Sequence, residues 1–171
     1  MLRDQQISES QAGASATADR PLRIALLSYR SKAHSGGQGI YVRHLSRELA
    51  ALGHHVEVIS GPPYPELDEG PSLTKVPSLD LYREPDPFRV PKLREFRSPI
   101  DVYEFLSVCT GSFPEPLTFS LRARRLLENR PAAERPDIVH DNQTLGYGML
   151  FMDRPGMPVV ATIHHPITVD K

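Results

Sequence analysis

Three short clusters in the sequence carry groups that could bind an anion or move a proton. They are His34-Ser35-Gly36-Gly37, His140-Asp141-Asn142-Gln143 and His164-His165. Histidine can donate a hydrogen bond to a phosphate or a sugar hydroxyl near neutral pH. Glycine lets backbone N–H groups approach an anion closely. Each cluster follows an apolar segment of strand length, which suggests that one arrangement of strands positions all three.

The two glycines of the first cluster precede a segment with helical periodicity. A helix N-terminus carries partial positive charge, so Gly36 and Gly37 suit a phosphate or carboxylate. A turn that needs a positive φ angle explains the pair equally well. A dinucleotide site is less favoured, because residues 37–42 keep only two glycines of G-x-G-x-x-G. In addition, the next strand ends in Ser60 where an acidic residue is expected.

Metal binding is not indicated by these clusters. His164 and His165 are adjacent in an extended segment, so their side chains point to opposite sides and rarely bind one ion. The sequence has no spaced Cys/His set typical of zinc sites and no Asp-x-Asp pattern. We therefore expect neither a metal nor a tightly bound cofactor.

The elements that would position the clusters alternate between strand and helix patterns. Apolar runs predict strands at residues 23–29, 55–60, 136–140 and 158–163, and periodic leucines predict helices at 40–52 and 117–129. Ser98-Pro99 is a typical helix start. Alternation of this kind predicts an α/β fold, a Rossmann-like parallel sheet with helices on both faces. Ligands of such sheets bind at the carboxyl ends of the strands, where all three clusters would meet.

The rest of the chain sets its organisation. Residues 1–20 are polar and small, which predicts a disordered tail before one domain at 21–171. Nine of the 17 prolines fall in residues 61–99, which predicts a long loop with short strands. A net charge of −1 argues against nucleic acid as a partner. The single cysteine, Cys109, suits a reducing compartment, so we expect a cytoplasmic protein.

At this point the motifs together resemble the opening of family 4 glycosyltransferases. Ser35-Gly36-Gly37, the following Ile40-Tyr41-Val42-Arg43-His44-Leu45, and residues 49–58 match the family's glycine loop, first helix and second strand. Pro136-Asp137-Ile138-Val139-His140 and Val160-Ala161-Thr162-Ile163-His164 match two later strands of the family. The resemblance covers residues 21–171.

The resemblance implies the N-terminal half of a GT-B architecture, in which two Rossmann-like domains face each other across a cleft. This half would bind an unknown acceptor, while the absent C-terminal domain would bind the nucleotide-sugar donor. The reaction would retain the anomeric configuration without a bound metal. His164 would be catalytic, beside the donor sugar, and Gly36 and Gly37 would contact the donor's diphosphate or sugar. Asn142, Gln143 and His165 would line the acceptor side of the cleft.

The sequence departs from the family at some positions, and some questions stay open. His165 stands where many members have an acidic or small residue, and residues 61–116 match no signature, which leaves the acceptor unnamed. Without the donor domain, the fragment is expected to be inactive alone. Basic helix faces such as Arg43 and Arg47 leave open a peripheral contact with the inner face of the membrane. The alternatives are a non-catalytic sugar- or protein-binding module and, less favoured, an NAD-dependent oxidoreductase or epimerase.

Overall fold

A five-stranded parallel sheet forms the centre of the protein. A computed structural model of the chain describes residues 20–31, 37–83, 85–86, 89–144, 146–152 and 156–164. Every neighbouring pair of strands is parallel, in the order β3-β2-β1-β4-β5. The strands are β1 (Arg23–Ser28), β2 (His55–Ser60), β3 (Ser72–Lys75), β4 (Ile138–Asn142) and β5 (Val159–Thr162). The strand order reverses between β1 and β4, which is where sheets of this kind bind ligands.

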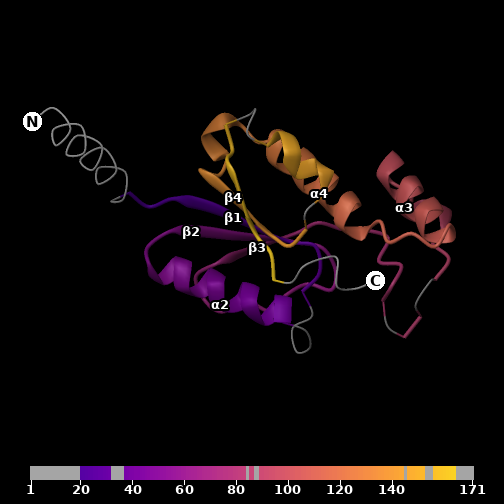
Figure 1. Ribbon diagram of the computed structural model, residues 1–171, viewed down its shortest axis with the longest axis horizontal. Helices are drawn as coiled ribbons and strands as arrows, with labels where there is room; N and C mark the ends of the chain where they lie inside the picture. The colour runs from indigo at the N-terminus through magenta and orange to yellow at the C-terminus, as the bar shows by residue number, and fades with distance from the viewer. Residues whose placement is uncertain are drawn as a thin grey trace, which may run out of the picture.

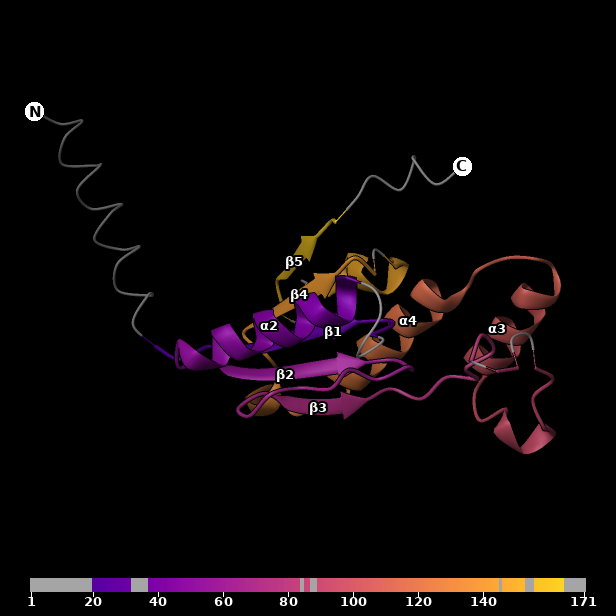
Figure 2. The ribbon, with the colours of Figure 1, turned by 90° about the horizontal axis from the view of Figure 1, so that it is seen from below.

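Helices cover both faces of the sheet, which confirms the predicted Rossmann-like α/β fold. Helix α2 (Gly37–Ala51) lies along one face and α4 (Glu115–Glu128) along the other (Figures 1 and 2). Alternate residues of β1 serve the two faces, as the two-residue period of a strand requires. Leu26 packs with Val42 of α2, whereas Leu27 belongs to the core shared with Phe119 and Leu127 of α4.

Several element boundaries differ from those predicted. Helix α2 begins at Gly37 rather than Ile40, and α4 begins at Glu115, with Pro116 in its first turn. Proline is tolerated there because first-turn N–H groups have no partner within the helix. Strand β4 begins at Ile138 and runs on to Asn142, two residues beyond the predicted end, because it continues to pair with β5 as far as Thr162.

The proline-rich region contains one short strand, as expected. Strand β3 lies at the edge of the sheet and pairs only with β2. Helix α3 (Pro99–Cys109) follows, and its start at Ser98-Pro99 confirms that prediction. The carboxylate of Asp101 accepts hydrogen bonds from the backbone N–H and the hydroxyl of Ser98, which caps the helix. After β4, the chain forms the 3-10 helix η3 (Tyr147–Phe151).

The predicted tail falls, apart from Arg20, outside the described residues. Arg20 forms an ion pair with Asp137 at 2.7 Å, at the amino end of β4. None of the described helices combines the length and the apolar character that crossing a bilayer requires. Within the described ranges, no three His, Cys, Asp or Glu side chains gather in a way that could hold a metal ion.

Candidate functional site

The ends of β4 and β5 bring two predicted site residues into direct contact. The Nε2 atom of His164 lies 2.7 Å from the Oδ1 atom of Asn142. The ring of Tyr41, on α2, meets the imidazole edge to face, with centroids 4.6 Å apart and planes at 82°. One imidazole is therefore held from two sides, by a strand end and by the first turns of a helix.

The register of the two strands produces this contact. Asn142 is paired with Thr162, and His164 lies two residues further on, so both side chains project from the sheet face that α2 covers. Asn142 is fully buried, whereas His164 is exposed. The site thus consists of an accessible imidazole on a buried amide support.

The hydrogen bond fixes which imidazole nitrogen is available. An amide oxygen only accepts, so the Nε2 atom of His164 must carry the proton that binds Asn142. The Nδ1 atom of His164 has no hydrogen-bond partner among the described residues. It is the atom through which this imidazole can meet a ligand, as an acceptor when neutral and as a donor when protonated.

His140 has a different role from His164. Its Nε2 atom lies 2.7 Å from the hydroxyl of Thr162, across the β4–β5 pair. Burial lowers the pKa of His140, and the charge of Asp141 opposes this only in part. His140 is therefore mainly neutral at pH 7, and its hydrogen bond to Thr162 links β4 to β5.

Gln143 links the end of β4 to the start of α2. Its backbone N–H donates to the carbonyl of Thr162 at 3.0 Å, and its side-chain oxygen lies 3.5 Å from the amide nitrogen of Gln38. Its φ angle is 57°, in the left-handed region that non-glycine residues seldom occupy. Such conformations cluster at functional sites, where the surrounding structure compensates for the strain.

Gly37 begins α2 beside Gln38 and is exposed. A Cβ atom built at this position would meet no described atom within 4 Å. Packing among the described residues therefore gives no reason for glycine here. The N–H groups of the first turn face outward with the positive end of the helix dipole, an arrangement that suits an anion.

Four of the six predicted site residues thus lie at one edge of the sheet. Asn142 touches His164, and Gly37 adjoins Gln38, which reaches Gln143. The other two, Gly36 and His165, lie outside the described residues. Sequence reasoning missed Tyr41 as a site residue. Its position one helical turn after Gly37 was the available signal.

The end of β2 has no group suited to a dinucleotide ribose. Ser60 is fully buried, and its hydroxyl donates to the carbonyl of Gly61 at 2.9 Å. A dinucleotide site would have an acidic residue here to bind a ribose hydroxyl, but the chain has Ser60, whose hydroxyl is already hydrogen-bonded. This geometry disfavours the oxidoreductase alternative.

Comparison with known proteins identifies a family and similar proteins. The family described as "Glycosyl transferase 4-like domain" matches residues 36–171. The chain is 64% identical over 151 residues to the MMP alpha-(1->4)-mannosyltransferase of Mycolicibacterium hassiacum, covering 88% of this chain and 36% of that protein. A crystal structure of CalG4, the calicheamicin glycosyltransferase, shares a TM-score of 0.47 and 20% identity, over 88% of this chain and 36% of that one. The chain thus spans about a third of the length of the relatives it matches.

Proposed function

Because the chain belongs to the glycosyl transferase 4-like domain family, we propose that it forms the acceptor-side domain of a retaining mannosyltransferase. The donor would be a nucleotide-linked mannose, and the product would carry an α-(1→4) linkage. The support is the 64% identity to a protein named for that activity, which extends over 88% of this chain. Binding of the donor is assigned to a further domain.

The stereochemistry of the proposed reaction constrains the donor. The bond between C1 of mannose and a diphosphate oxygen breaks, and a bond from C1 to the acceptor's O4 forms. Retention means that the new bond leaves C1 on the same face as the old one. An α-linked product therefore requires an α-linked nucleotide donor.

The observation that carries the proposal is the imidazole of His164 held by Asn142 and Tyr41 at the sheet edge. In the transition state, negative charge develops on the departing diphosphate and positive charge on the sugar ring. Fixed dipoles stabilise such charges without reorganising during the reaction. We assign His164 to the reacting sugar and the N–H groups of the first turn of α2, beginning at Gly37, to the diphosphate.

The acceptor side is assigned to the neighbouring amides. Gln38 and Gln143 provide side-chain donors and acceptors that suit sugar hydroxyl groups at this edge. A membrane contact through α2 is less favoured, because the basic side chains there are already paired. Arg43 binds Asp68 through two nitrogen atoms, and Arg47 binds Glu48 at 2.7 Å. We propose that the enzyme is cytoplasmic, because a single cysteine, Cys109, suits a reducing compartment.

The test is a chimera in which this chain replaces the matching segment of the Mycolicibacterium relative. We expect it to transfer mannose from GDP-mannose or UDP-mannose to an oligomannoside, whereas His164→Ala lowers kcat at least ~100-fold. The unmodified relative, assayed in parallel, shows that the conditions support turnover. Full turnover by the folded His164→Ala chimera would overturn the assignment. Saturable quenching of NADH fluorescence by the chain would instead favour the oxidoreductase.

A further inference from the structure

A pocket lies away from His164, beside the edge strand β3. Its volume is about 450 Å³, and it is bounded by the segment after β3, the start of α3 and the second half of α4. Four cationic side chains line it, and they come from three separate parts of the sequence: Lys75, Arg97, Arg122 and Arg125. Strand β3 lies at the opposite edge of the sheet from β5, which leads to His164. At about 4.8 Å per strand, four spacings separate these two edge strands by roughly 19 Å.

Of the four cations, the two carboxylates at the pocket neutralise only Arg122, because their remaining oxygen contacts are with other groups. One oxygen of Asp101 accepts hydrogen bonds from Ser98 and from the backbone N–H of Arg97, and the other pairs with Arg122 at 2.6 Å. Glu95 pairs with Arg89 and accepts from the backbone N–H of Lys92 at 2.8 Å. Pairing with Arg89 lowers the pKa of Glu95 to about 2, so this carboxylate stays ionised.

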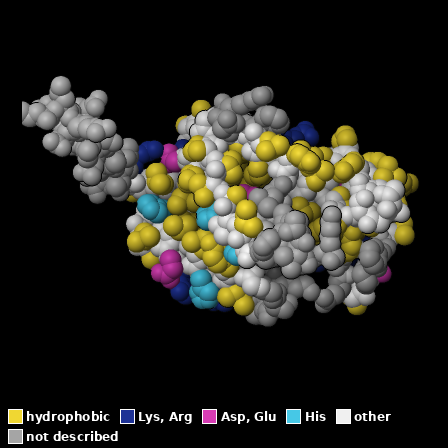
Figure 3. Space-filling model, viewed as in Figure 1, with side chains coloured by type: hydrophobic (Ala, Val, Ile, Leu, Met, Phe, Trp, Pro, Cys, Tyr) yellow, Lys and Arg dark blue, Asp and Glu magenta, His cyan; other side chains and the backbone are white. Residues whose placement is uncertain are grey.

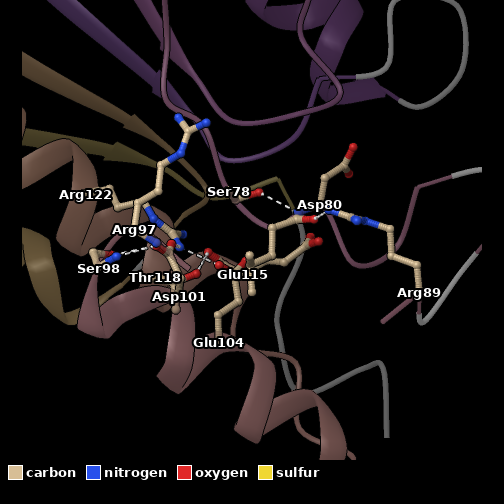
Figure 4. Close-up of polar contacts among 11 residues, drawn as sticks. Ser78, Asp80, Arg89, Arg97, Ser98, Asp101, Glu104, Glu115, Thr118 and Arg122 are labelled. Carbon is tan, nitrogen blue, oxygen red and sulfur yellow. Dashed lines mark hydrogen bonds and ion pairs between the residues drawn. The ribbon is translucent and has the colours of Figure 1, made fainter. Parts of the chain in front are cut away.

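Arg122 is fixed within a buried ion cluster at the base of the pocket. It reaches between Asp101 and Glu104, two acidic side chains of α3 (Figure 4). The side chain of Arg122 is only 11% exposed and that of Glu104 only 2%. This cluster joins α3 to α4 and so holds the pocket walls in place.

The remaining three cations have no anionic partner within the part of the chain that the structure describes. Arg97 and Arg125 are exposed, and neither side chain has a hydrogen bond or ion pair with any residue that the structure describes. Lys75 is exposed, with its ammonium group 4.9 Å from the centre of the Tyr64 ring. The adjacent Arg124 instead pairs with Glu128 at 2.8 Å, as a solvated helix face would. Like charges around one pocket repel each other, and an anion between them would relieve that repulsion.

The pocket also has an apolar wall, formed by Val76, Leu79, Ile100 and Leu126. Ligand pockets typically combine such a wall with a few polar groups that fix the orientation of the ligand, and they span about 300–1,000 Å³. The size suits a body of about one sugar ring.

We propose that this pocket binds the anionic group of a monosaccharide-sized ligand, either a phosphoryl ester or a carboxylate. Arg97 and Arg125 hold the oxyanion, and the apolar wall packs against the body of the ligand. The proposal does not rest on the transfer reaction assigned to His164, so binding can be tested on the 171-residue chain alone.

The test is a calorimetric titration of the chain with glucose 6-phosphate, glucuronate and neutral glucose. We expect saturable binding of at least one charged sugar, with a Kd below about 1 mM, and none of glucose. Arg97→Ala/Arg125→Ala should weaken that binding at least tenfold. Arg97 contacts Asp101 only through its backbone N–H, which alanine keeps. The double variant therefore leaves the cap of α3 intact. The relative affinities of the two charged sugars distinguish a phosphoryl ligand from a carboxylate.

Arg47→Ala is the matched control, because it removes an arginine of α2 whose side chain is 45% exposed. It should change the affinity less than twofold. Equal weakening in this control, equal binding of glucose, or no saturation at about 20 mM of any probe would overturn the proposal. If the double variant unfolds, Arg125→Gln and Lys75→Gln, measured singly, should each weaken binding threefold or more. Wild-type affinity in both of these variants overturns the proposal equally.

Discussion

The Nε2 atom of His164 lies 2.7 Å from the Oδ1 atom of Asn142, which joins an exposed imidazole to a fully buried amide. Removing the amide should leave the imidazole in place but free to rotate and to change tautomer. We expect Asn142→Ala to lower kcat of the chimera about 10- to 100-fold. Mutation of a residue that orients a functional imidazole commonly lowers activity by a factor of this size.

Nitrogen-15 NMR of the imidazole in the 171-residue chain gives a readout besides activity. In the wild-type chain, Nε2 should carry the proton and Nδ1 should not. Asn142→Ala should give a mixture of both tautomers. Thr144→Ala, a nearby buried change outside the contact, is the control and should keep the wild-type pattern. An unchanged tautomer in Asn142→Ala would show that Asn142 does not orient His164.

Gly37 offers a way to separate folding from function. A methyl group there meets no described atom, and alanine favours a helix over glycine by up to about 1 kcal/mol. Gly37→Ala should therefore leave the free energy of unfolding unchanged or slightly raised, as measured in urea. In the chimera, it should raise KM for the donor, because the methyl group occupies space that the diphosphate needs.

Gly148→Ala is the contrasting substitution. A Cβ atom at Gly148 would lie 2.4 Å from the backbone oxygen of Ser120 on α4, so the backbone must shift. We expect a loss of about 1–3 kcal/mol of stability. Equal stability effects at Gly37 and Gly148 would contradict this account of both glycines.

The fold could be predicted because its signals are local. Strand β2 has the predicted bounds, since its apolar run follows Gly53, whose φ angle of 90° ends the preceding helix region. The resemblance to family 4 glycosyltransferases is likewise confirmed, by a family match over residues 36–171. Strand β3 could not be located, because Ser72–Lys75 is short, has only one apolar residue and pairs only with β2 among the described strands.

The site could be predicted only in outline. Topology places the ends of β4 and β5 together, but the contact between Asn142 and His164 depends on a register that the sequence does not reveal. The cations at Lys75, Arg97 and Arg125 converge across 50 residues of chain that match no motif. The roles of Gly36 and His165, and the absence of a metal or cofactor, remain predictions.

The ion pair between Glu57 and Arg130 links β2 to the end of α4. Two bonds of 2.6 and 2.7 Å join the partners, whose side chains are each 22% exposed. Burial alone would raise the pKa of Glu57, but hydrogen bonds from Arg130 and Thr74 outweigh burial and lower it. The pair therefore stabilises the fold above the unfolded pKa of 4.5, and this contribution is lost as the pH falls through the lower folded pKa.

Glu57→Gln should lower the free energy of unfolding by about 1–3 kcal/mol at pH 7. This range lies between the losses typical of exposed and of buried ion pairs. Most of this difference should vanish at pH 3 in urea unfolding experiments. Arg124→Ala breaks a more exposed pair on the same helix and should cost only about 0.3–0.5 kcal/mol. If the loss of stability in Glu57→Gln stayed constant down to pH 3, the negative charge of Glu57 would not be its cause.

Glu115, at the start of α4, should produce the opposite pH dependence. Burial is the largest cause that raises its pKa, to about 7; the charge of Arg30 at 3.3 Å opposes this rise, and the charges of Glu104 and Asp80 add to it. Between pH 4.5 and 7, the unfolded chain releases this proton while the folded chain keeps it. The contribution of Glu115 to stability is therefore fully present below pH 4.5, and about 3 kcal/mol of it is lost as the pH rises through 7.

Glu115→Gln should remove this loss, because an amide never ionises and its oxygen can still accept from Arg30. Urea unfolding at pH 5, 6, 7 and 8 should show the variant more stable than the wild type at pH 8, with the difference shrinking towards pH 5. Glu128→Gln, at a side chain 35% exposed, is the control and should run parallel to the wild type. A Glu115→Gln variant less stable at pH 8 would mean that the ion pair with Arg30 outweighs the cost of burying the carboxylate.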